Sequence, residues 1–132
     1  MITTTETEDR LTISLIVEPS TMRDIRRRVR DRLFTWDLSE FAGDVVLVVS
    51  ELLTNVHEHA EGECVLEIEY ADEELIVRVG DTARRPPVVR PFCGKEEDGR
   101  GLVLVDALAA RWETVITATG KVITCVFATS GK

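Results

Sequence analysis

Residues 51–60, Glu-Leu-Leu-Thr-Asn-Val-His-Glu-His-Ala, end the longest amphipathic helix that the sequence predicts, over residues 40–59. Glu51, Asn55 and His59 follow at four-residue intervals, so each lies about 40° around the helix from the one before. This polar line runs along the edge of the apolar stripe, and His59 lies within the stripe. A carboxylate there can act as a base, and an amide oxygen can ligate a hard cation such as Mg²⁺. On spacing alone, a helix with polar residues at its solvent margin is the favoured interpretation.

Alternating and helical periodicities place further elements on both sides of this helix. Strands are expected at residues 11–17, 64–70, 74–80, 114–118 and 122–128, and further helices at 21–34 and 101–111. Strands and helices do not alternate strictly, which favours an α+β fold. The expected architecture is a two-layer α/β sandwich with helices on one face of a mixed, mainly antiparallel sheet. Residues 1–10 are expected to be a flexible leader, and residues 11–129 a single domain.

Composition narrows the classes of function. The chain has 132 residues and a formal net charge of -8, which argues against nucleic acid or an anionic membrane as a direct partner. No apolar run approaches the roughly 18 residues of a membrane-spanning helix, and the N-terminus does not have the pattern of a signal peptide. Cys64, Cys93 and Cys125 form no CxxC pair, so neither a disulfide framework nor a zinc cluster is indicated. A reducing cytoplasm is the expected location.

Two other features could carry chemistry. Asp81 follows the strand at 74–80, where its carboxylate could accept hydrogen bonds from a ligand amine or could cap a turn. A long, proline-containing loop at 82–98 comes next, and loops of this length are often functional lids or disordered segments. The loop is followed by Gly-Arg-Gly-Leu at residues 99–102, where a helix N-terminus could bind phosphate or the glycines could simply allow a tight turn.

The order of these features resembles a known family, the histidine-kinase-like ATPase domain (Bergerat fold), and within it the small anti-sigma-factor serine/threonine kinases. The resemblance extends over residues 10–129 and is carried by three segments: residues 51–60, then Val77-Arg78-Val79-Gly80-Asp81, then Gly99-Arg100-Gly101-Leu102-Val103-Leu104-Val105-Asp106. It implies that the chain has the Bergerat-type fold and binds ATP with Mg²⁺.

The resemblance also implies roles for individual residues. Asn55 would be the Mg²⁺ ligand that bridges to the nucleotide phosphates. Glu51 would be the catalytic base that takes a proton from a substrate serine, and Asp81 would accept the adenine amine. Residues 82–98 would form the ATP lid. The full set of nucleotide-binding residues implied is Asn55, His59, Asp81, Ala83, Gly99, Arg100, Gly101, Leu102 and Thr124.

Two positions depart from the family pattern. Ala83 stands where the family normally has glycine, two residues after the adenine-binding Asp. Val122 stands where threonine often follows Gly-Lys, with Thr124 two residues further on. Two hypotheses therefore stay open. The chain is a kinase that phosphorylates a serine of a STAS-type anti-anti-sigma protein and sequesters a sigma factor, or it is a non-catalytic partner-binding module with weak or no ATP binding. Plain ATP hydrolysis is a third alternative.

The helix at 21–34 is strongly basic. It holds six arginines against two aspartates, a local charge of +4 on an otherwise acidic chain. A charge run is usually a solvated face, but arginine is also favoured at protein interfaces. By resemblance to the anti-sigma kinases, this helix would face the sigma factor and its antagonist through Arg23, Arg26, Arg27 and Arg30. The family often forms homodimers, so a homodimer is also considered.

Overall fold

The computed structural model describes residues 2–59, 63–81, 103–118 and 120–129. Their strands form one six-stranded sheet in the order β1-β2-β3-β4-β6-β5, with every neighbouring pair antiparallel. The strands are β1 (Ile2–Glu6), β2 (Arg10–Ile16), β3 (Glu63–Ala71), β4 (Glu74–Asp81), β5 (Arg111–Thr117) and β6 (Gly120–Ala128). The expected α+β class is confirmed, and the sheet expected to be mixed is antiparallel throughout the described strands.

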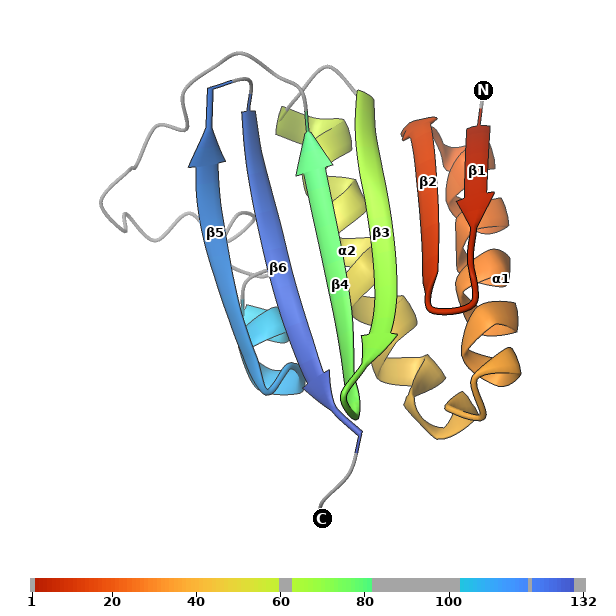
Figure 1. Ribbon diagram of the computed structural model, residues 1–132. Helices are drawn as coiled ribbons and strands as arrows, with labels where there is room; N and C mark the ends of the chain where they lie inside the picture. The colour runs from red at the N-terminus through yellow and green to blue at the C-terminus, as the bar shows by residue number, and fades with distance from the viewer. Residues whose placement is uncertain (1, 60–62, 82–102, 119, 130–132) are drawn as a thin grey trace.

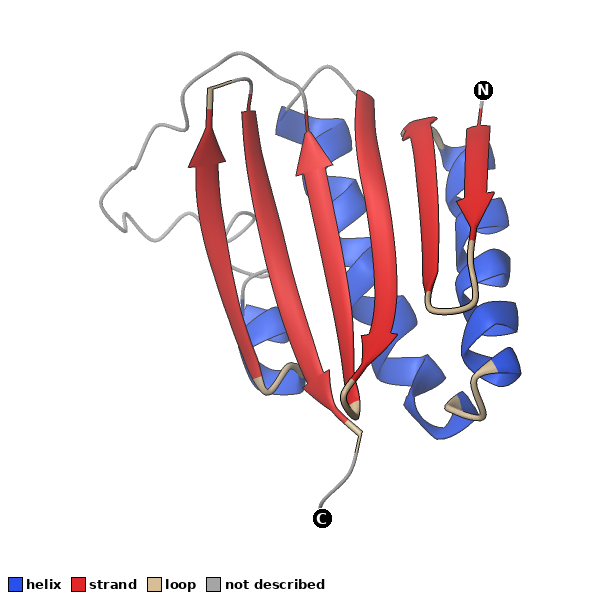
Figure 2. Cartoon of the chain, viewed as in Figure 1, coloured by secondary structure: helices blue, strands red, loops and turns tan. Residues whose placement is uncertain are grey.

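The helices cover one face of this sheet (Figures 1 and 2). They are α1 (Pro19–Thr35), the short 3-10 helix η1 (Ser39–Phe41), α2 (Ala42–His59) and a helical turn at residues 103–108. None of the helices in the described ranges is long and apolar enough to cross a lipid bilayer.

The core lies between the sheet and the helices. In β2, Leu11, Ile13 and Leu15 are buried while the residues between them are not, which is the alternation of a half-buried strand. α1 and α2 bury one stripe each against this face, with Ile25, Val29, Leu33, Val45, Val48, Val49, Leu52 and Leu53 almost completely enclosed. Burying one such side chain contributes about 1.5–3 kcal/mol, so this layer contact dominates the stability of the fold.

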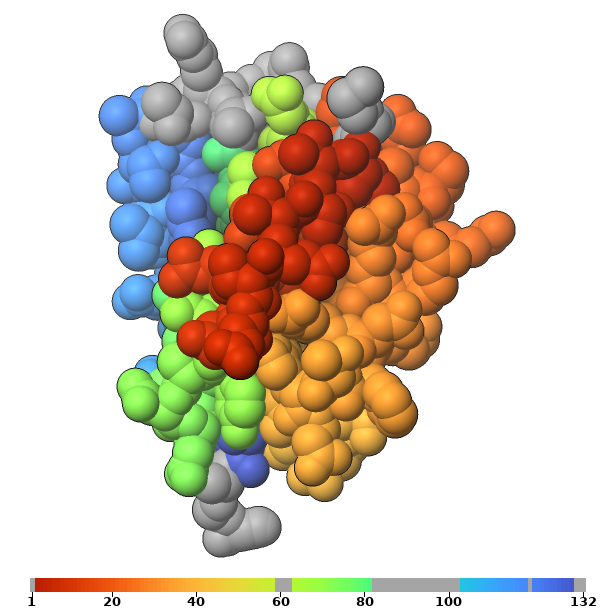
Figure 3. Space-filling model, turned by 45° about the vertical axis from the view of Figure 1, so that its right-hand side comes forward, coloured from red at the N-terminus to blue at the C-terminus, as the bar shows by residue number. Residues whose placement is uncertain are grey.

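The N-terminal segment differs from its expectation. Residues 2–6, expected to be part of a flexible leader, form the edge strand β1 and pair with β2. Arginines of α1 hold it from the helix side. Arg28 Nη1 donates to Thr4 Oγ1 at 2.9 Å, and Arg32 Nη1 lies 2.8 Å from Glu6 Oε1. Figure 3 shows the β1–β2 hairpin in red alongside α1 in orange.

Element boundaries shift by a few residues from the sequence-based expectation. α1 begins at Pro19 rather than 21, since proline suits the first helical turn and the backbone N–H of Glu18 donates to Thr21 Oγ1 at 2.9 Å. β5 begins at Arg111, which was expected to end a helix. Its guanidinium binds Glu74 at 3.0 Å, a strand contact that no local pattern reveals.

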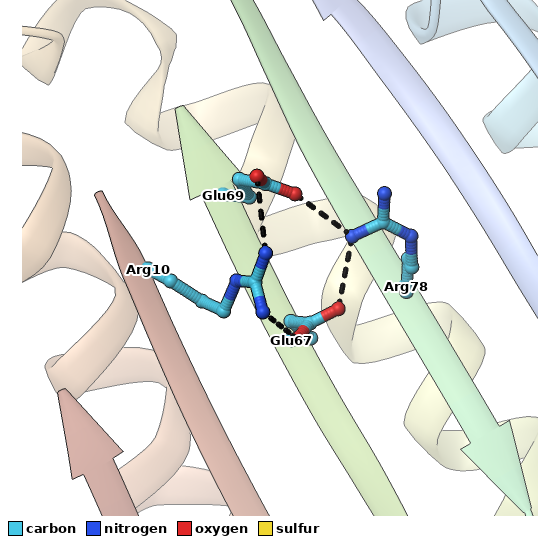
Figure 4. A network of polar contacts seen from close by, with 4 residues as sticks. All are labelled: Arg10, Glu67, Glu69 and Arg78. Atoms are coloured by element: carbon cyan, nitrogen blue, oxygen red, sulfur yellow. Dashed lines mark hydrogen bonds and ion pairs between the residues drawn. The ribbon is translucent and has the colours of Figure 1, made fainter. Parts of the chain in front are cut away.

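The other face of the sheet carries a charged network (Figure 4). Arg10 of β2 lies 3.2 Å from Glu69 and 3.4 Å from Glu67, both on β3. Arg78 of β4 donates to the same two carboxylates at 3.1 and 2.9 Å. Two positive and two negative charges thus alternate across three strands.

Candidate functional site

Three segments of the chain end or begin at the same end of the molecule. α2 ends at His59, β4 ends at Asp81 and β6 begins at Gly120. Figure 1 shows these three ends toward the top of the view, with α2 behind β3 and β4. Residues about 20 to 60 positions apart in the sequence therefore meet at one border between the helices and the sheet.

Asp81 faces the helix layer at this border. The strand register pairs it with Cys64 of β3 on one side and Lys121 of β6 on the other. Its side chain is only 3% exposed, and Lys121 Nζ lies 2.8 Å from its Oδ2, with the Lys121 side chain 33% exposed. A nearly buried carboxylate is thus held by a partly exposed ammonium, in a charge-assisted hydrogen bond.

Cys64, which pairs with Asp81 from β3, is buried at this border. Burial, together with the negative charge of Asp81, raises the pKa of the Cys64 thiol to about 12. The thiol is therefore neutral at physiological pH and adds no charge beside the carboxylate.

Glu51 and Asn55 lie in the C-terminal half of α2, which ends at this border. Both side chains are half-buried, while Leu52 and Val56 beside them are buried in the core. They therefore stand at the margin of the layer contact, one helical turn apart. Groups of these kinds, acceptor carboxylates, an ammonium donor and an amide, can bind a polar ligand that has both donors and acceptors.

A family model described as the histidine kinase-like ATPase domain matches residues 15–127, which is most of the chain. The protein belongs to this family. The match covers α1, α2, β3, β4 and β5 in full. It includes Leu15 and Ile16 of β2 and all of β6 except Ala128, and it leaves out β1.

Solved structures show the same fold. The RsbU and RsbW domains of Rv1364c from Mycobacterium tuberculosis match with a TM-score of 0.68 and 20% identity, over 93% of this chain and 33% of that chain. The blue-light activated histidine kinase of Erythrobacter litoralis EL346 matches with a TM-score of 0.54 and 28% identity, over 70% of this chain and 31% of that one. The histidine kinase domain of the same protein matches with a TM-score of 0.58 and 21% identity, over 83% and 60%.

The chain thus spans about a third of the length of the first two of these structures. A search of curated proteins returned no match.

In this histidine kinase-like ATPase domain, Thr124 does not join Asp81. Thr124 pairs with Arg78, and the side chains of this row lie on the open face of the sheet with the charged network. Asp81 faces the helices, and a strand residue three positions beyond Lys121 points to the opposite side. Thr124, predicted from the sequence to bind nucleotide, therefore lies on the face of the sheet opposite to Asp81. Val122 also lies on the open face, opposite Gly80, so its departure from the family pattern does not touch Asp81.

Sequence analysis of the ATPase domain did not predict the contact between Lys121 and Asp81. Lys121 lies opposite Asp81 because β4 and β6 pair antiparallel in this register. The local signal, a lysine after the hairpin Gly120, is too common to indicate a contact with an acid 40 positions away. The pairing partner of β4 had to be known first.

Other predicted nucleotide-binding residues of the ATPase domain lie outside the described residues. These are Ala83, Gly99, Arg100, Gly101, Leu102 and the predicted lid at 82–98. The backbone of His59 ends α2, and its side chain is likewise outside the description.

The arginines predicted to bind partners fall into two groups. Arg23, Arg27 and Arg30 are exposed, and Arg27 forms an ion pair with Asp24 at 2.7 Å. Arg26 is half-buried, and its Nε donates to Ser50 Oγ of α2 at 3.0 Å. Arg26 thus joins the two helices of the ATPase domain, while the other three point outward.

Proposed function

We propose that the chain binds ATP through Asp81 and Asn55 and transfers its γ-phosphate to a serine of an antagonist protein. The observation that carries the proposal is the nearly buried Asp81 carboxylate at the end of β4, at the same end of the molecule as the polar margin of α2. A carboxylate is an acceptor only, so it suits the exocyclic amine of adenine.

Each helix residue has a separate task in this proposal. Glu51 accepts the proton of the substrate serine while the serine oxygen bonds to the γ-phosphorus and the bond to ADP breaks. The half-buried Asn55 amide offers one oxygen ligand, a fit for Mg²⁺, which usually takes few protein ligands beside the phosphates. When bound, Mg²⁺ would neutralise charge on the phosphates. In the described ranges no cluster of three or more His, Cys, Asp or Glu residues could hold a metal by itself.

The partner surface in this proposal is the outer face of α1. Arg23, Arg27, Arg30 and Phe34 follow at intervals of four, three and four, so they share one stripe. Phe34 is 75% exposed, which is unusual for so large an apolar side chain. An exposed aromatic beside guanidinium groups suits an acidic protein surface such as one on a STAS-type antagonist or a sigma factor.

ATP binding is the first test. Calorimetry with ATP and Mg²⁺ should give clear binding for the wild type and none for Asp81→Asn, which replaces an acceptor oxygen by a donor. Wild-type protein that fails to bind ATP would refute the proposal. Transfer of labelled γ-phosphate to STAS-domain proteins should then be lost in Glu51→Ala at unchanged ATP affinity. Replacing Arg23, Arg27 and Arg30 by glutamate should abolish capture of the unphosphorylated STAS-domain protein.

A second function has one observation in its favour. Asp81 already holds the ammonium of Lys121, and this competes with an incoming amine for the carboxylate. A domain that binds ATP weakly and acts only by capturing partners would have the same α1 surface. The Asp81→Asn variant separates the two functions. A module that only binds partners would capture them equally well in this variant and in the wild type, with or without ATP.

A further inference from the structure

We propose that Lys121 is a second base-reading residue, which donates a hydrogen bond to the ring nitrogen N1 of adenine while Asp81 accepts from the 6-amine. This inference rests on the proposed ATP-binding function and deepens it. It makes Lys121 a specificity-determining residue.

Lys121 is the more exposed member of its ion pair with Asp81. The two residues are directly opposite each other in the β4–β6 register, on the face toward the helices. The Lys121 side chain is 33% exposed and that of Asp81 3%, with Nζ only 2.8 Å from Oδ2. A ligand that reaches the carboxylate from solvent therefore comes within reach of the ammonium as well.

The ammonium also has donors to spare. Lysine carries three N–H donors and no acceptor, and in the described part of the chain its one partner is Asp81. The remaining donors can turn toward a ligand without breaking the ion pair. The pair thus presents an acceptor and a donor side by side, with the acceptor nearly buried.

The Watson–Crick edge of adenine has the matching order. Its 6-amine is a donor and the adjacent N1 is an acceptor, so one edge satisfies both members of the pair. Reading a base through this edge is a common way in which proteins recognise an unpaired purine. A bystander role, in which Lys121 only neutralises Asp81, would give no interaction with N1.

The experiment removes each half of the predicted bond in turn. Calorimetry compares ATP with 1-deaza-ATP, in which a C–H replaces N1, on wild type and Lys121→Met. A hydrogen bond with a charged donor corresponds to a factor of about ten to a hundred in affinity. The wild type should therefore prefer ATP by at least about tenfold, and Lys121→Met should bind both nucleotides within about threefold of each other. Lys121→Arg, which keeps a cationic donor, should restore part of the preference.

The ratio of the two affinities isolates the contact from stability. Partial unfolding of Lys121→Met would weaken both nucleotides by the same factor and leave their ratio unchanged. Arg111→Met is the matched control, since it removes a cation from the opposite end of the β5–β6 hairpin and should keep the wild-type ratio. The same ATP preference in wild type and Lys121→Met would overturn the inference while ATP binding stands. A wild type that binds neither nucleotide would overturn the proposed function itself, and the inference with it.

Discussion

Gly120 packs directly against the backbone of Asp81. A Cβ on Gly120 would overlap the carbonyl oxygen of Asp81 and lie 3.1 Å from its Oδ1. The bare glycine lets β6 begin where β4 ends, which brings the following residue, Lys121, opposite the carboxylate. The ion pair at the candidate nucleotide site thus depends on the absence of a Cβ at Gly120.

Gly120→Ala should therefore destabilise the protein. The overlap is with backbone, which cannot rotate away, so the hairpin must shift at a cost of about 1–3 kcal/mol. Urea unfolding measures the change. Gly43→Ala in α2 is the control, because nothing lies within 4 Å of the added Cβ, and it should be neutral or stabilising by up to about 1 kcal/mol. Equal effects of the two substitutions would contradict the close packing at Gly120.

Two arginines of α1 should differ sharply in their effect on stability. Arg32 is 12% exposed, binds Glu6 at 2.8 Å and the carbonyl oxygen of Thr7, and lies over the Trp36 ring at 4.8 Å. Arg32→Ala should cost about 1–2 kcal/mol, from lost charge-assisted bonds and lost packing.

Arg30 is exposed, and Arg30→Ala should change the free energy of unfolding by less than about 0.5 kcal/mol. Chemical denaturation of the two variants side by side measures the difference. Equal stabilities would mean that β1 is not held by α1.

The charged network on the open sheet face should make stability depend on pH. Hydrogen bonds from Arg78 and Arg10 lower the pKa of Glu69. A carboxyl whose folded pKa is depressed stabilises the fold above its unfolded pKa of about 4.3, and that contribution is lost as pH falls through the lower folded pKa.

Glu69→Gln should therefore be less stable than wild type at pH 7, by up to about 1 kcal/mol, because the network is partly solvated. Urea unfolding at pH 7, 5, 4 and 3 should show the two proteins converging at the acid end. A difference that stays constant over this range would mean that the ionised Glu69 contributes nothing through the network.

Cysteine reactivity offers a probe of the border around Asp81. Burial raises the pKa of Cys125 to about 11, and burial with the Asp81 charge raises that of Cys64 to about 12. In a Cys93→Ser protein, neither thiol should be alkylated in the native state between pH 7 and 9, and both should react in denaturant. Mass spectrometry counts the labels. Rapid labelling of Cys64 in the native protein would show that the region beside Asp81 is open to solvent.

Helix α2 was predicted well because its signal is local. The stripe of apolar residues along α2 predicted a helix over 40–59, and the helix runs from Ala42 to His59. The strand β1 was missed because its threonines carry no alternation of apolar and polar residues. Its stability comes from pairing with β2 and from Arg28 and Arg32, which lie more than 20 positions away.

The amino-acid sequence alone determined the α+β class, the helix that carries Glu51 and Asn55, and the family, since these rest on local patterns and on their order along the chain. Only the tertiary structure decided which residue of β6 meets Asp81. Strand register is set by pairing between distant segments, and side chains alternate from one face to the other. Lys121 consequently points to the carboxylate, while Thr124, three residues on, points to the other side of the sheet.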